Sequence, residues 1–411
     1  MRSGAAPSEW GISTMAVKIL SVFGTRPEAI KMASVIKALE QTPGLESIVC
    51  VSGQHRSMLE QVLHLFDIRP RYDLALMTGN QTLNTLASRL IFLFDDVFAQ
   101  ERPDRVLVHG GTTTACAAAL AAFHRRIPVG HVEAGLRTGN LSSPWPEEMN
   151  RRVVDSLSDL LFAPTHSAKA NLMTEALGGR VVVTGNTVID ALQMSIARLD
   201  ADAALRAELD ARLPPLDSTR PIVLVTGHRR ESFGEGFASI WAALDELGRS
   251  GDAQIVYPLH LNPNVRGPAR ARIGATPNVH LIEPLDYLGF VRLMQRAAIV
   301  LTDSGGVQEE APALGKPVLL MRDVTERPEA LAAGVVRLVG TRADAIVRGV
   351  RLLLDELGAG GAPREPVSPY GDGRAAARIA AAICGEPFEE FSSLVPPHEA
   401  AGNARVHAMP L

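Results

Sequence analysis

Cysteine is scarce and unpaired in this chain of 411 residues. The three cysteines, Cys50, Cys116 and Cys384, lie far apart, with no CxxC pair and no cluster of cysteine with histidine. This spacing indicates neither a disulfide framework nor a set of zinc ligands. We therefore expect small buried thiols in a reducing compartment, and no metal site.

Long apolar runs and an excess of charge of one sign are missing as well. No apolar segment approaches the roughly 18–20 residues of a membrane span, and the first fourteen residues lack the apolar part of a secretion signal. The net charge is −4, with basic and acidic residues interspersed, so no basic stripe indicates binding to nucleic acid or to an anionic membrane. We expect a soluble, cytoplasmic protein with a disordered extension at residues 1–14 and a disordered tail at residues 388–411.

A glycine-rich dinucleotide fingerprint is also absent, because no GxGxxG follows any of the expected strands. That argues against a bound dinucleotide and against redox chemistry that depends on NAD. No cofactor is therefore expected.

What the chain does contain is a regular alternation of short β-branched runs with helical segments of ten or more residues, which is typical of parallel sheets with crossover helices. The chain is too long for one core and suits two domains of about 150–200 residues each. The expected strands are residues 17–23, 47–52, 105–109, 127–132, 160–163 and 181–184 in the first half, and 221–226, 254–258, 279–282, 298–302, 317–321 and 335–339 in the second.

These runs predict an α/β protein made of two Rossmann-like, doubly wound domains. A polar stretch at 213–220 (LPPLDSTR) interrupts the pattern. We place the N-terminal domain at 15–195 and the C-terminal domain at 196–365, and expect the helix within 369–385 to pack back on the first domain. Such pairs of domains bind ligands between them, at the carboxyl ends of the strands.

The loop after the first strand, 24–28 (GTRPE), opens a helix, because proline suits the first helical turn. Arg26 and Lys31 flank that helix start. Free backbone N–H groups and two cations there would suit a pyrophosphate; the alternative is an ordinary helix start with surface cations.

The second domain offers a stronger pattern. The strand ending in IVLTD leads into Ser304 and Gly305, which begin another helix. Glycine permits close backbone approach, and the helix start favours an anion. Glu309 and Glu310 follow; one of them could accept the hydroxyls of a ribose, whereas the alternative is a solvated pair of acids.

A histidine and arginines follow the strand PIVLVT. His228 and Arg229 stand where they could hold a departing phosphate. A lone histidine is more often structural, but its place beside two cations favours a functional role.

Carboxylates gather in the first domain. Glu133 directly follows the strand IPVGHV, and Glu147 and Glu148 begin the helix after PWP. Acids in a first helical turn often only complement the helix dipole. A charged Glu133 at the end of an apolar strand is harder to explain as a surface feature.

Long motifs in a fixed order support a more specific interpretation. From about residue 17 to 383 they resemble the non-hydrolysing UDP-N-acetylglucosamine 2-epimerases; the segments that carry the resemblance are GTRPEAIKM, GQHRSML, VEAGLRTGN, PWPEEMNRR, TGNTVIDAL, TGHRRESFGEG, PLHLNPNV, LTDSGGVQEEAPALGKPVL and RDVTERPEA. The resemblance implies a GT-B-type fold with the active site between two domains, UDP held mainly by the C-terminal domain, and a homodimer.

The resemblance also implies roles for individual residues. The positions matching those that hold UDP are Arg26, Lys31, Phe290 (near the uracil), His228, Ser304, Gly305, Glu310 and Arg327. Those matching catalytic residues are the carboxylates Glu133 and Glu147, together with His228, which would stabilise the departing UDP. Those matching an allosteric site for a second substrate molecule are Gln54, Glu148, Arg229 and His260. The implied reaction is epimerisation of UDP-N-acetylglucosamine at C2, by elimination and re-addition of UDP, for bacterial surface polysaccharides.

One position departs from the family pattern. The family has Gly-Asp-Thr after the strand RVLVH, whereas this chain reads HGGTTT, with Gly111 in place of an essential acid. Glycine has no side chain and transfers no proton, so impaired activity, a variant activity, or replacement of the acid by Glu133 or a water all stay open.

The competing functions are a hydrolysing 2-epimerase, an epimerase for a modified UDP-sugar, a GT-B glycosyltransferase and an inactive UDP-sugar-binding homologue.

Overall fold

The computed structural model describes residues 16–53, 56–76, 81–229, 232–325, 327–358 and 365–393. Its strands are β1 (Val17–Phe23), β2 (Leu45–Val51), β3 (Tyr72–Asp73), β4 (Arg105–His109), β5 (Val129–Val132), β6 (Leu160–Ala163), β7 (Arg180–Val183), β8 (Ile222–Thr226), β9 (Gln254–Pro258), β10 (Val279–Ile282), β11 (Ile299–Thr302), β12 (Val318–Leu320) and β13 (Val336–Leu338). Its helices are α1 (Arg26–Gln41), α2 (Arg56–Leu65), α3 (Leu83–Glu101), α4 (Thr113–His124), α5 (Glu147–Leu157), α6 (His166–Thr174), α7 (Thr187–Ala201), α8 (Ala203–Ala211), α9 (Glu235–Ser250), α10 (Pro263–Ile273), α11 (Tyr287–Arg296), α12 (Gly305–Ala313), α13 (Pro328–Ala332), α14 (Ala343–Gly358) and α15 (Ala375–Cys384).

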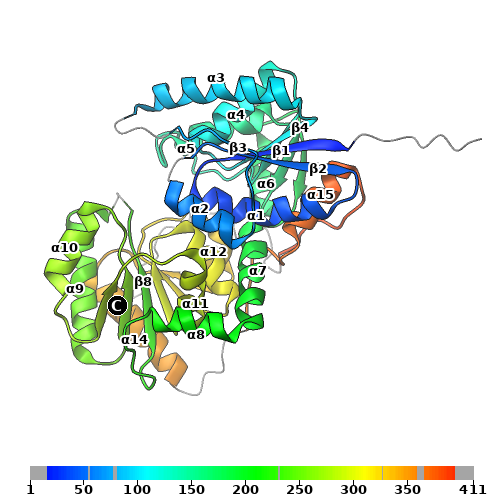
Figure 1. Cartoon of the computed structure of the whole chain (residues 1–411). Coiled ribbons are helices and arrows are strands. Elements are labelled where there is room, and N and C mark those ends of the chain that lie inside the picture. Colours follow the sequence, from blue (N-terminus) through cyan, green and yellow to red (C-terminus); the bar gives the residue numbers. More distant parts are fainter. Residues whose placement is uncertain are drawn as a thin grey trace, which may run out of the picture.

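The strands form two separate parallel sheets, one in each lobe of Figure 1. The first has the order β3-β2-β1-β4-β5-β6-β7 and the second β10-β9-β8-β11-β12-β13. In both, the order reverses beside the first strand of the sheet, between β1 and β4 and between β8 and β11. This topology confirms the expected α/β class with two Rossmann-like sheets, and the reversal points are where such folds bind ligands.

Helices cover both faces of each sheet, as all-parallel sheets require. On the first sheet, α1, α2, α7 and α15 pack on one face and α3 and α4 on the other. On the second, α9, α10 and α14 pack on one face and α11 and α12 on the other. Successive residues of β1 alternate between two apolar clusters, Ile19 in one and Leu20 in the other, because strand side chains alternate in direction.

Helix α7 joins the two lobes and contacts helices of both, including α1 in the first and α11 and α12 in the second (Figure 1). The boundary expected between residues 195 and 196 falls inside this helix. One apolar cluster therefore runs from the first sheet through α7 to the second.

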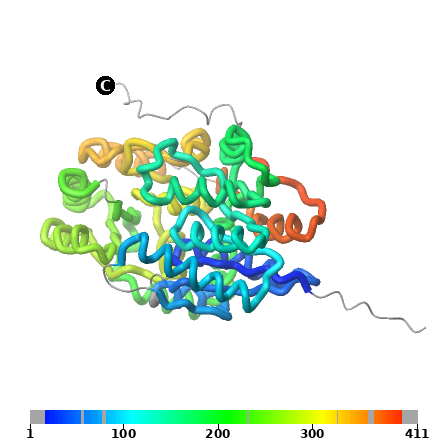
Figure 2. The backbone as a smooth tube through the Cα atoms, turned by 90° about the horizontal axis from the view of Figure 1, so that it is seen from above, coloured from blue at the N-terminus to red at the C-terminus, as the bar shows by residue number. Residues whose placement is uncertain are grey.

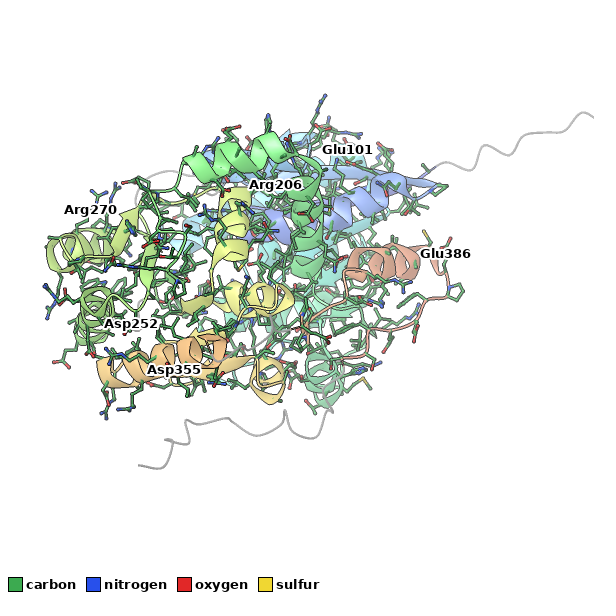
Figure 3. The ribbon with its side chains drawn as sticks, turned by 90° about the horizontal axis from the view of Figure 1, so that it is seen from below. Glu101, Arg206, Asp252, Arg270, Asp355 and Glu386 are labelled. Atoms are coloured by element: carbon green, nitrogen blue, oxygen red, sulfur yellow. The ribbon has the colours of Figure 1, made fainter. Side chains whose placement is uncertain are left out.

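The C-terminal segment returns to the first lobe. Helix α15 packs on α1 and α7, apart from α14, as the red and orange segments of Figure 2 show. Seen from below (Figure 3), Arg270, Asp252 and Asp355 mark the second lobe, whereas Glu386 lies on the first, just past α15.

The expectation of a tail from residue 388 is wrong for residues 388–393. The N–H of Phe391 donates to Val183 O at 2.9 Å, its ring is buried, and Arg378 lies over that ring. This short stretch extends the edge at β7. The expected extension at 1–14 and the remainder of the tail, 394–411, lie outside the described residues. No helix in the described part of the chain is long and apolar enough to cross a membrane.

Candidate functional site

The N–H groups of the loop between β1 and α1 are bound by a glutamate in the first turn of α1. Thr25 caps α1, and the Glu28 carboxylate accepts hydrogen bonds from the N–H groups of Gly24 (3.0 Å) and Thr25 (2.8 Å) and from the Thr112 hydroxyl (2.6 Å). The expectation of free N–H groups for a pyrophosphate at this helix start is therefore wrong for these two. They bind a capping carboxylate instead, in a capping box whose sequence signature is T-x-x-E.

Arg26 reaches from this loop to the other lobe. Its Nη2 donates to the carbonyl oxygen of Leu285, in the loop before α11, at 3.3 Å. Burial lowers the pKa of Arg26, although Asp286 and Glu310 act in the opposite direction. The guanidinium thus lies where the lobes meet, beside the acid expected to bind ribose.

Lys31 is not a surface cation at the helix start; it is buried one turn further along α1. Its Nζ forms an ion pair with Glu133 and a second one, at 3.4 Å, with Glu309 of the other lobe. Burial alone would lower the pKa of Lys31, but the two carboxylates raise it above its ordinary value. The ammonium therefore stays charged and joins the two lobes.

Glu133 follows β5 with a backbone φ of 66°, a left-handed conformation that is rare for residues other than glycine. Its Oε2 accepts from Lys31 and from Asn186 Nδ2 (3.1 Å), and lies 3.8 Å from His109 Nε2. Burial alone would raise the pKa of Glu133, but Lys31 holds it well below its ordinary value. Strain of this kind gathers at functional sites.

The loop after β4 is anchored at both of its glycines. Gly110 has a φ of 62°, and its oxygen is bonded by His131 Nε2 at 2.9 Å; the Gly111 oxygen accepts from Asn150 Nδ2 at 3.0 Å. The other His131 nitrogen lies 2.6 Å from Asp155. The loop is thus held from β5 and α5.

No room is left beside Gly111 for a side chain. A Cβ atom there would collide with the Glu147 carbonyl oxygen and lie 3.1 Å from its carbonyl carbon. The first turn of α5 therefore closely approaches Gly111, the position at which the sequence resemblance predicts an aspartate.

The two acids that begin α5 differ in their surroundings. Glu147 is half-buried, whereas Glu148 is fully buried and accepts from Arg152 (3.1 Å) and from the N–H of Thr138 (3.1 Å). Glu148 therefore braces α5 against the preceding loop. A role in a second substrate site stays a prediction.

In the second lobe, Asp303 organises the loop after β8. It is fully buried, and its Oδ2 accepts from the N–H groups of His228 and Arg229, both at 2.8 Å. The His228 ring stacks on His260, with centroids 5.3 Å apart. Three of the expected residues thus gather here, whereas Gln54 lies outside the described residues.

The start of α12 brings together the expected nucleotide-binding residues. Ser304 is the N-cap and makes no side-chain cap bond, and Gly305 lies so close to Arg327 that a Cβ would be 2.7 Å from its Nη1. The Arg327 Nε in turn donates to Glu309 at 2.7 Å. A helix start and a buried guanidinium suit a phosphate.

Glu310 lies deeper on the same helix. Its carboxylate accepts from the Tyr287 hydroxyl at 2.6 Å, and burial raises its pKa to about 7. Phe290 lies on α11, half-buried against the core.

Sequence reasoning missed four polar residues of this site: Glu309 as an ion-pair partner, and His109, Asn186 and Asp303 altogether. Each of the last three follows or ends an expected strand, and that position is the signal that could have found them. Within the described ranges, no group of three or more histidine, cysteine, aspartate or glutamate side chains is arranged to hold a metal ion.

Comparison with known proteins agrees with the motifs. A family model described as UDP-N-acetylglucosamine 2-epimerase matches residues 37–384. A probable UDP-N-acetylglucosamine 2-epimerase of Ralstonia nicotianae is 56% identical over 368 residues, covering 89% of this chain and 98% of that protein. The UDP-N-acetylglucosamine 2-epimerase of Escherichia coli is 53% identical over 369 residues, with the same two coverages.

Solved structures agree as well. The Neisseria meningitidis UDP-GlcNAc 2-epimerase bound to UDP-GlcNAc superposes with a TM-score of 0.86 at 48% identity, over 90% of this chain and all of that one. The Methanocaldococcus jannaschii enzyme in complex with UDP-GlcNAc and UDP gives 0.78 at 31% identity, with the same coverages. The GT-B-type fold expected from the sequence is thereby confirmed, and the chain belongs to the UDP-N-acetylglucosamine 2-epimerase family.

Proposed function

We propose that this protein interconverts UDP-N-acetylglucosamine and UDP-N-acetylmannosamine without hydrolysing them. One observation carries the proposal: a buried carboxylate, Glu133, is paired with Lys31, which also contacts Glu309 of the other lobe. An acid/base group and cations for a diphosphate therefore share one site at the reversal points of both sheets.

The chemistry follows from the substrate. The hydrogen at C2 of the sugar is not next to a carbonyl group, so its simple removal is too costly. When the C2–H bond breaks, its electron pair forms a C1–C2 double bond, and the C1–O bond breaks with its pair leaving on UDP. Protonation of the 2-acetamidoglucal on the opposite face and return of UDP to C1 give the epimer.

Cations around the diphosphate make this departure possible. We assign four groups to the diphosphate, with His228 beside them: Arg26, Lys31, Arg327 and the helix start at Ser304 and Gly305. Glu310 is assigned to the ribose and Phe290 to the uracil.

Proton transfer at C2 is assigned to Glu133 and Glu147. Lys31 holds the pKa of Glu133 low, which makes Glu133 a weak base. A bound diphosphate competes for Lys31 and adds negative charge nearby, so it raises the proton affinity of Glu133 when the substrate is in place.

The experiment is incubation with UDP-N-acetylglucosamine in D₂O, followed by NMR of the products. The proposal predicts UDP-N-acetylmannosamine with deuterium at C2, and no exchange above background for Glu133→Gln. Free N-acetylmannosamine with released UDP would instead indicate a hydrolysing enzyme. Binding with neither product nor exchange would indicate an inactive UDP-sugar-binding protein, the outcome that Gly111 makes worth testing.

Finer features of the family are also part of the proposal: a cytoplasmic homodimer that supplies precursors of bacterial surface polysaccharides. Exposed Phe92 on α3 and Phe123 on α4, two helices that pack together, support a buried partner face. Analytical ultracentrifugation tests the dimer.

A further inference from the structure

The imidazole of His109 has an unusual environment for a buried polar group. His109 is the last residue of β4, and its side chain is only 5% exposed. Among the described residues, neither Nδ1 nor Nε2 has a hydrogen-bond partner. Buried polar groups without a partner are rare and destabilise the folded protein, so a group from outside the protein is expected to complete this one.

The surroundings of His109 identify where that group would lie. Its Nε2 is 3.8 Å from Oε2 of Glu133, too far for a hydrogen bond. The next two residues, Gly110 and Gly111, have no side chains, and their carbonyl oxygens are held by His131 and Asn150. The first side chain that precedes position 111 in the sequence is therefore the His109 ring.

The charge state of the ring restricts the kind of ligand. Burial, reinforced by the positive charges of Lys31 and Arg151, lowers the pKa of His109 to about 3, against the opposing effect of Glu133. The ring is therefore neutral at pH 7, with one N–H donor and one acceptor nitrogen. A neutral ring adds no charge attraction for a phosphate, whereas its donor and its acceptor both match a hydroxyl or an amide.

We propose that His109 is a sugar-binding residue, which hydrogen-bonds the acetamido group on C2 or the hydroxyl on C3 of the bound UDP-sugar and so positions C2 against Glu133. This inference rests on the proposed function and deepens it. The sugar would thereby have a polar contact near Gly111, where the family resemblance predicts an aspartate.

Titration calorimetry with two ligands tests the proposal, because UDP lacks the sugar. His109→Leu removes both ring nitrogens at similar volume, and we expect it to weaken UDP-N-acetylglucosamine about 3- to 10-fold, the effect of one lost hydrogen bond. The affinity for UDP should stay within about twofold of that of the unmodified protein, because UDP has no sugar with which His109 could form the lost hydrogen bond. His109→Gln, whose amide also offers a donor and an acceptor, should recover most of the loss, and His124→Gln on the surface of α4 is the matched control.

A second measurement does not depend on the stability of the variants. With ¹⁵N-labelled histidine, the His109 ring signals should shift when UDP-N-acetylglucosamine is added and should not shift with UDP alone. Equal losses for both ligands in His109→Leu, or ring signals that respond equally to both, would mean a structural role and overturn the inference. If the unmodified protein neither binds nor converts UDP-N-acetylglucosamine, the proposed function itself fails. The failure of the proposed function can thus be told apart from the failure of the His109 inference, which the variants and the ring signals report.

Discussion

The Nζ atom of Lys31 lies 3.4 Å from the Oε2 atom of Glu309, and this ion pair connects α1 of one lobe with α12 of the other. Glu309 also holds Arg327 at 2.7 Å. Two cations assigned to the diphosphate are thus neutralised by the protein's own carboxylates. An incoming diphosphate must share these cations, which couples nucleotide binding to the contact between lobes.

Removal of the Glu309 charge should destabilise the protein strongly. Glu309 is 1% exposed, and its loss leaves Lys31 and Arg327 with less compensation. We expect Glu309→Gln to lower the free energy of unfolding by about 3–5 kcal/mol, as for other broken buried pairs. Urea unfolding measures this change.

The matched control is an exposed acid. Glu283 is 60% exposed and pairs with Arg266 and Arg270. The change Glu283→Gln should lower the free energy of unfolding by only about 0–1 kcal/mol. Equal losses in the two variants would show that burial does not set the strength of the Lys31–Glu309 pair.

A methyl group at Gly305 should weaken UDP binding through Arg327. The added Cβ would lie 2.7 Å from Nη1 and 2.9 Å from Cζ of Arg327, so the guanidinium must move. We expect Gly305→Ala to lose about 1.5–3 kcal/mol of UDP binding by calorimetry, the value of a hydrogen bond to a charged group. Gly306→Ala is the comparison, since its Cβ would only make an ordinary contact of 3.8 Å with Glu310. A similar loss of UDP affinity in both variants would mean that the added methyl groups act on the start of α12 and not through Arg327.

Glu310 should make stability depend on pH in a recognisable direction. Burial raises its pKa from 4.5 to about 7, so the folded protein holds a proton that the unfolded chain releases. The stability that this group contributes is complete below pH 4.5 and is lost as the pH rises through 7. At about 1.4 kcal/mol per pKa unit, the loss between pH 4 and pH 8 is about 3 kcal/mol.

The comparison of the native protein with Glu310→Gln isolates this contribution. The amide stays neutral and can still accept from Tyr287, so the stability difference between the two proteins should change by that amount between pH 4 and pH 8. Asp190, with its pKa raised to about 6, acts in the same direction but is present in both proteins. A constant difference across this range would contradict a raised pKa for Glu310.

The fold was largely predictable because each strand is a short apolar run between polar turns. Most expected strands agree with the observed ones to within one or two residues, as for β1 and β4. The two-residue strand β3 has too few residues to produce a pattern. Helix α1 begins at Arg26, before its apolar run, because Thr25 and Glu28 form a capping box.

The site was predictable as a set of positions but not as a set of contacts. Parallel topology brings strand ends together, so Glu133 could be located from sequence. Its partners could not, because Lys31 and Asn186 lie 102 and 53 residues away and meet it only through the crossovers. Nor does a sequence show that His109 has no hydrogen-bond partner among the described residues, or that α5 leaves no space beside Gly111.

Substitution of Gly111 tests both the geometry and the chemistry of the missing acid. Any side chain at this position brings a Cβ against the Glu147 backbone, so the first turn of α5 must shift. We expect Gly111→Ala and Gly111→Asp each to lose about 1–3 kcal/mol of stability in urea unfolding, as in other overpacked sites. Unchanged stability in both would show that this turn moves freely.

Only the aspartate variant adds an acid, so the alanine variant is its matched control. If the family's carboxylate exchanges a proton at C2, Gly111→Asp should incorporate solvent deuterium at C2 about 10²–10⁴-fold faster than Gly111→Ala, the usual contribution of a positioned acid or base. UDP affinity should be nearly equal in all three proteins, because the acid would face the sugar and not the nucleotide. Fast exchange in the protein with Gly111, with no difference between the two variants, would mean that another group carries the proton. Glu133 and Glu147 would then be the residues to substitute next, because Glu133 is buried beside Lys31 and Glu147 supplies the backbone that fills the space of the missing acid.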